Sequence, residues 1–139
     1  MSVQADVYVA SDDQDALRYD NQPAAFEERE QFGNFTELEL STLWAKITGI
    51  EWNVESLREF HTVLDQDDGE RCIKRLPAAM ALELARLSPD QISTSASKWA
   101  ATDEMACEAT DVQPIIEALV RLAKRASATG RNIYFWNCL

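Results

Sequence analysis

Apolar and polar residues alternate over residues 3–10, VQADVYVA, where small apolar side chains occupy every second position. This period of two is typical of a β-strand with one buried face. Ser11 follows directly and, with Gln14 three residues later, has the pattern of a helix N-terminus. The chain therefore begins with a predicted strand that leads into a short helix ending near residue 19.

Helical periodicity returns after residues 20–35, an irregular acidic connection for which one helical turn around Phe26 is predicted. Thr36 and Glu39 then form a capping box, apolar residues recur every three or four positions, and Gly49 provides a stop. Similar signals predict further helices over residues 53–59, 77–87, 88–100 and 111–130.

Two short apolar stretches, residues 60–64 and 72–76, flank the acidic segment DQDDGER. They predict two strands joined by a loop with Gly69 near its tip. A helix that continues through residue 64 is the competing interpretation.

The last ten residues, GRNIYFWNCL, predict a final strand. Ile133 and Phe135 alternate with Tyr134 and Trp136, so both faces of this strand are apolar. Such a strand is typical of the covered centre of a sheet. The alternative is that one aromatic face is left open for a partner or for a second copy of the chain.

Together these elements predict one α+β domain over residues 1–139, with a small mixed or antiparallel sheet of about four strands and about five helices packed on it. A chain of 139 residues is long enough to bury one core. No apolar run approaches the roughly 20 residues that cross a bilayer, and the N-terminal residues lack the pattern of a secretion signal. The expected location is the cytoplasm.

Two stretches, FTELELSTLWAKITGIEW and SKWAATDEMA, resemble those of a group of small bacterial proteins known only as uncharacterised. The resemblance extends to the overall layout, which combines an acidic first half, two Trp-containing helices and an aromatic C-terminal strand. It implies a bacterial cytosolic protein and brings no activity or functional residues with it.

The formal net charge of −11 comes from the first half of the chain. Residues 11–70 carry 16 acidic and 4 basic side chains, whereas residues 71–139 carry 7 acidic and 9 basic ones. A negative field of this size repels phosphate backbones and anionic lipids, so no nucleic-acid or membrane partner is predicted. It favours a basic protein partner, and the sequence leaves the oligomeric state open, including a homodimer.

Candidate partner-binding residues are acidic side chains of two segments and two aromatic side chains of the last strand. They are Glu27, Glu28, Glu30, Asp65, Asp67, Asp68, Glu70, Tyr134 and Trp136. If the acidic residues form one negative surface, it would steer a basic partner toward the protein. Solvated acidic faces without a partner are the plainer interpretation.

Metal and nucleotide sites find no support in the sequence motifs. An EF-hand loop starting at Asp65 needs glycine and glutamate where this chain has Glu70 and Leu76. The glycine-rich phosphate-binding motifs are also absent. No metal site or cofactor is therefore predicted.

His61, the only histidine, is the conventional candidate for a general base. It would need Cys72, Cys107 or a carboxylate close to it in space. Two hypotheses follow. The favoured one is a non-enzymatic binding protein with an acidic surface, such as an inhibitor or immunity-type partner of a basic protein. The alternative is a small enzyme that uses His61 with a cysteine or nearby carboxylates.

Overall fold

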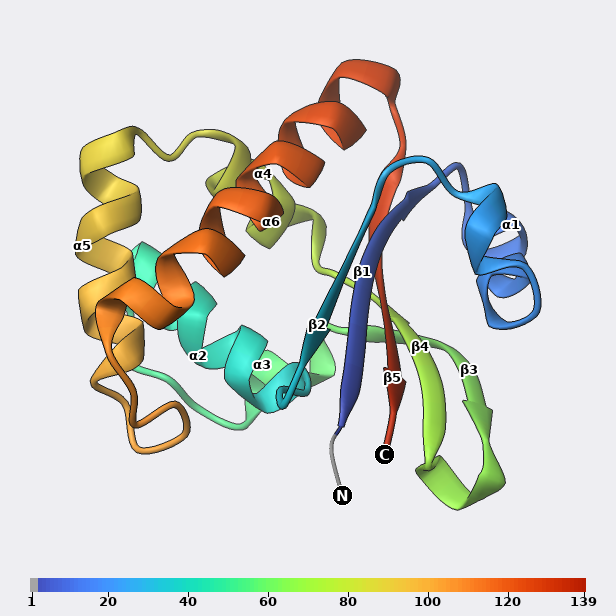
Figure 1. The fold of residues 1–139 in the computed structure, drawn as a ribbon, viewed down its shortest axis with the longest axis horizontal. Coiled ribbons are helices and arrows are strands. Elements are labelled where there is room, and N and C mark those ends of the chain that lie inside the picture. Colours follow the sequence, from blue (N-terminus) through green and yellow to red (C-terminus); the bar gives the residue numbers. More distant parts are fainter. Residues whose placement is uncertain (1–2) are drawn as a thin grey trace.

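The two ends of the chain meet as neighbouring strands in the middle of one sheet (Figure 1). The computed structural model describes residues 3–139. The strands are β1 (Gln4–Ala10), β2 (Arg29–Gly33), β3 (His61–Gln66), β4 (Arg71–Arg75) and β5 (Asn132–Cys138). Each pairs antiparallel with its neighbours in the order β2-β1-β5-β4-β3. The fold is therefore α+β, and its sheet is antiparallel.

Several helices begin or end at the signals read from the sequence, whereas the first helix is capped by Asp12 rather than Ser11 and the last begins at Ala109 rather than at Asp111. They are α1 (Asp13–Leu17), α2 (Glu37–Thr48), α3 (Glu55–Arg58), α4 (Ala78–Ala85), α5 (Pro89–Ala100) and α6 (Ala109–Thr129). Thr36 and Ser88 cap α2 and α5 through complete capping boxes, and Gly49 and Gly130 end α2 and α6 in the left-handed conformation. No helix within residues 3–139 combines the length and apolar character needed to cross a membrane.

One face of the sheet packs against α2, α4, α5 and α6, on the left in Figure 1. Val7 of β1 and Phe135 of β5 are paired neighbours that point into this helical layer. Trp99 of α5 is fully buried there, and its indole N–H donates to the carbonyl of Glu39 in α2 at 2.9 Å. The main core thus lies between the sheet and these helices.

The opposite face carries an aromatic cluster. Figure 1 shows that α1 and the turns that follow it lie on this side of the sheet. The rings of Tyr8 and Tyr19 stack with centroids 4.0 Å apart, and Phe26 and Tyr134 pack against Tyr8. Both faces of β5 are therefore covered, as the sequence predicts for a central strand.

The sheet has one strand more than the sequence indicates, and within residues 3–139 six α-helices surround it. The stretch interpreted as irregular contains a 3-10 turn at Pro23–Ala25 and then β2. This strand was missed because it lies at the sheet edge and consists mainly of polar residues. The alternative helix through residue 64 is wrong, since β3 pairs with β4 from His61 onward.

Candidate functional site

The sheet order places the two predicted acidic segments at opposite edges. β2 and the residues before it lie at one edge, and the β3–β4 hairpin lies at the other. Four strand spacings separate these edges, which amounts to about 19 Å. At the β2 edge, Glu30 pairs with Arg121 and Glu28 Oε1 lies 3.2 Å from Arg125 Nε, whereas Glu27 is exposed. The candidates therefore do not form one continuous surface.

Several acidic side chains of the first half pair with basic side chains of the second half. Asp13 lies 2.8 Å from Arg75, Asp20 lies 2.9 Å from Arg71, and Glu37 lies 2.6 Å from Lys74. These pairs join α1, the turn after it and α2 to β4. The uneven charge along the chain is thus partly neutralised within the fold.

The hairpin tip keeps most of its carboxylates free. Asp67 Oδ2 lies 3.1 Å from Arg71 Nη1. Asp65, Asp68 and Glu70 are exposed and form no ion pair within residues 3–139. The hairpin is therefore where the predicted acidic candidates remain available to a partner.

The polar groups of the two aromatic candidates form hydrogen bonds within the protein. Tyr134 is 0% exposed, and its hydroxyl donates to Asp13 Oδ1 at 2.8 Å. Burial first, and then this hydrogen bond, raises the pKa of Tyr134 to about 12. Trp136 is half-buried and donates its indole N–H to Asp20 Oδ1 at 3.1 Å. Tyr134 is thus part of the interior and Trp136 lies at its margin.

His61 and Cys72 lie on neighbouring strands but on opposite faces of the sheet. His61 Nε2 is 3.5 Å from Asp13 Oδ2, on the side of α1. Cys72 faces the helical layer with Lys74, and Cys107 lies in the connection between α5 and α6. The fold therefore does not bring His61 and a cysteine together.

The environment of Cys72 also disfavours a thiolate. Burial, together with the negative charges of Glu37 and Asp65, outweighs the effect of Lys74 and raises the pKa of the Cys72 thiol. A reactive cysteine needs the opposite shift. Cys72 therefore lacks the electrostatic activation expected of a catalytic nucleophile.

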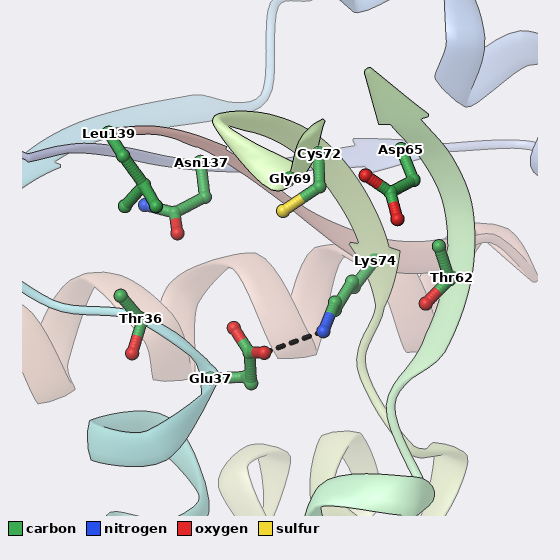
Figure 2. A pocket seen from close by; sticks show the side chains of 9 residues that line it. All are labelled: Thr36, Glu37, Thr62, Asp65, Gly69, Cys72, Lys74, Asn137 and Leu139. Carbon is green, nitrogen blue, oxygen red and sulfur yellow. Dashed lines mark hydrogen bonds and ion pairs between the residues drawn. The ribbon is translucent and has the colours of Figure 1, made fainter. Parts of the chain in front are cut away.

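A cavity of about 330 Å³ opens beside the acidic hairpin, on the helical side of the sheet. We call it the hairpin cavity. Figure 2 shows side chains from β3, β4, β5 and the N-terminus of α2 around it. Its lining includes Glu37, Thr62, Asp65, Cys72, Lys74 and Asn137.

A β-bulge brings two residues of β3 into the lining. The register with β4 shifts between Thr62 and Leu64, so Thr62 and Asp65, an odd number of positions apart, both border the cavity. Regular alternation would place them on opposite faces. The bulge therefore adds a hydroxyl and a carboxylate to the same wall.

Asn137 is a buried residue that supplies an acceptor to the cavity. The residue is only 2% exposed, and its Nδ2 donates to the carbonyls of Gln4 at 2.8 Å and Phe35 at 3.4 Å. Because both neighbours are acceptors, the amide nitrogen must face them, which leaves the carbonyl oxygen for the cavity. Within residues 3–139 that oxygen accepts no hydrogen bond, and Figure 2 shows it directed toward the open space.

The cavity contains one ion pair. Lys74 Nζ lies 2.6 Å from Glu37 Oε1, and the two side chains are 19% and 25% exposed. The positive charge in the lining is therefore already paired, whereas the Asp65 carboxylate is free. Sequence reasoning missed Thr62, Lys74 and Asn137 as site residues, because the strand order and the bulge, not a local motif, bring them together.

No group of three or more metal-binding side chains within residues 3–139 is placed to hold an ion. Comparison of the chain with protein-family models, curated proteins and solved structures finds no match. These comparisons thus connect the chain to no family of assigned function, and bacterial origin stays an expectation from the resemblance.

Proposed function

We propose that this chain is a binding protein that recognises a basic protein partner through the β3–β4 hairpin and the hairpin cavity. The observation that carries this proposal is the position of free carboxylates at the tip, directly beside a cavity whose lining includes several hydrogen-bond acceptors. An inhibitor or immunity-type protein is one example of such a binder.

Charge complementarity supports the hairpin over the other acidic segment. Glu28 and Glu30 already pair with arginines of α6, so a basic partner would have to displace those arginines. Asp65, Asp68 and Glu70 need no such exchange. Free carboxylates around a docking site accelerate the approach of a cationic partner and select against acidic ones.

Selection from a random-peptide display library on the immobilised protein tests this proposal. A hairpin-neutral variant removes the charges at the tip while keeping similar side-chain shapes. It carries Asp65→Asn, Asp67→Asn, Asp68→Asn and Glu70→Gln. A matched control removes the same number of charges from exposed residues elsewhere. It carries Glu51→Gln, Asp103→Asn, Glu104→Gln and Glu117→Gln.

We expect peptides enriched on the wild-type protein to be basic. The hairpin-neutral variant should bind them at least about tenfold more weakly, and the control within about twofold of wild type, because only charges at the docking site act at short range. Binding should also weaken from about 0.05 to about 0.5 M NaCl as the Debye length shrinks. Enrichment of neutral or acidic peptides, or unchanged binding by the hairpin-neutral variant, would contradict the proposal.

A further inference from the structure

We infer that the hairpin cavity accepts one arginine side chain of the partner. This inference rests on the proposed function, because it names the group that a basic partner inserts beside the acidic hairpin. The free carboxylates alone would not specify it. The second, independent observation is Asn137, a buried residue whose carbonyl oxygen opens onto the cavity without a hydrogen-bond donor within residues 3–139.

The lining offers acceptors and carries one negative charge that its own ammonium group does not balance. Asn137 contributes an amide oxygen, Asp65 a carboxylate and Thr62 a hydroxyl. Glu37 accepts from Lys74 through Oε1, and its Oε2 receives no hydrogen bond within residues 3–139. With two carboxylates and one ammonium, the side chains of the lining carry a net charge of −1. One monovalent cation would neutralise it.

A guanidinium matches this arrangement better than an ammonium. It has five N–H donors in a plane and no acceptor, so it can serve acceptors on several walls at once. It is also less strongly hydrated than an ammonium and loses less on entering a half-enclosed site. Lysine would bring a second compact ammonium close to Lys74.

The cavity can also hold the aliphatic part of the side chain. Cys72 and Leu139 contribute less polar surface to the lining, against which the methylene groups of arginine can pack while the charged end reaches the acceptors. A volume of about 330 Å³ lies at the lower end of the usual range for ligand pockets. One long side chain is therefore a suitable occupant.

Titration of the ¹⁵N-labelled protein with three blocked tripeptides tests this inference. The probes are Ac-Gly-Arg-Gly-NH₂, the lysine analogue and the citrulline analogue, which keeps the arginine shape without its charge. We expect saturable shifts for the backbone amides of Thr62, Cys72 and Asn137 and for the side-chain amide of Asn137. The arginine probe should bind at least about fivefold more tightly than the lysine probe, because only guanidinium donates along a planar fork. Citrulline should give no saturable shift.

Two variants probe the cavity itself. Cys72→Met fills it without changing a charge, and Thr62→Val removes one hydroxyl with little change in shape. Cys138→Met is the matched control, because Cys138 is similarly half-buried but belongs to the other side of β5. The spectrum of each free variant reports whether it is folded. We expect Cys72→Met to abolish the arginine shifts, Thr62→Val to weaken them, and Cys138→Met to preserve them.

The outcomes separate the inference from the proposed function. If basic display peptides bind through the hairpin but bind Cys72→Met and Thr62→Val as tightly as wild type, the cavity does not hold the arginine and only the inference fails. Equal affinity for arginine and lysine tripeptides also overturns the inference alone. If the display selection yields no basic peptides, the proposed function fails with it.

Discussion

Lys74 in β4 and Glu37 in the first turn of α2 form an ion pair with 2.6 Å between Nζ and Oε1. The pair joins the sheet to α2 within the lining of the hairpin cavity. Because both side chains are mostly shielded from water, the pair is more than a solvated surface contact. It holds the wall of the candidate site in place.

Breaking this pair from one side should destabilise the protein more than removing both charges. We expect Lys74→Met to lower the free energy of unfolding by about 1–3 kcal/mol, because it leaves the Glu37 carboxylate partly buried without its cation. The double variant Lys74→Met with Glu37→Gln should recover at least half of that loss. Urea denaturation monitored by circular dichroism measures both changes.

The control for this cycle is an exposed ion pair. Arg58 and Glu55 are 78% and 65% exposed, so Arg58→Met should change the unfolding free energy by less than about 0.5 kcal/mol. If Lys74→Met lowers the free energy of unfolding no more than Arg58→Met does, the Lys74–Glu37 pair stabilises the fold no more than an exposed ion pair.

Asp13 should make stability depend on acid pH. Partial burial acts to raise the pKa of Asp13, but the hydrogen bond from Tyr134 and the charge of Arg75 outweigh it, so the pKa lies below its usual value. A carboxyl group with a lowered native pKa stabilises the fold above its unfolded pKa of about 3.9, and this stabilisation is lost as pH falls through the native value.

We therefore expect Asp13→Asn to cost about 1 kcal/mol at neutral pH, a modest figure because the carboxylate is partly solvated. The difference from wild type should shrink as pH falls from about 4 through the lowered native pKa, where Asp13 itself becomes protonated. Thermal melts between neutral and acid pH measure it. Asp68→Asn, at an exposed carboxylate without an ion pair in residues 3–139, serves as the control, and an equal response of the two variants would refute the role of Asp13.

The three tyrosines should resist ionisation while the protein is folded. Burial is the main cause of the raised pKa of Tyr8, Tyr19 and Tyr134. Groups with a raised native pKa stabilise the fold fully below the unfolded value, here about 10, and that stability is lost as pH rises through the native pKa. An absorbance titration near 295 nm should show little tyrosinate at pH 11 until the chain unfolds. A gradual rise centred near pH 10 in folded protein would contradict the burial of these hydroxyls.

Trp99 should be the tryptophan most sensitive to substitution. Trp99→Phe leaves space in the core and removes the hydrogen bond to the Glu39 carbonyl that joins α5 to α2. We expect a loss of about 1.5–3 kcal/mol in unfolding free energy. Trp52→Phe is the matched control, since Trp52 is half-buried and donates instead to Ser41 Oγ. Guanidinium denaturation compares the two, and an equal loss would argue against this central role of Trp99.

Sequence patterns located most elements because their signals act within a few residues. Thr36 and Glu39 form the predicted capping box, and Gly49 adopts the left-handed conformation that ends α2. The two apolar faces of the last strand likewise indicated a central position, and β5 lies between β1 and β4. β2 was missed because an edge strand with polar side chains lacks the alternation of a half-buried strand.

By itself, the sequence determined the α+β class, the presence of the helices and the excess of negative charge, because these follow from local periodicity, capping and composition. Only the tertiary structure decided which charges remain free. Pairing between distant segments places Glu28 and Glu30 beside α6 and leaves Asp65, Asp68 and Glu70 at the opposite edge. The same pairing sets the end of β5 beside β4, so a buried amide and an acidic hairpin meet at one cavity. Contacts between residues far apart in the chain leave no periodic pattern in the sequence of either contacting segment, so the sequence alone does not predict them.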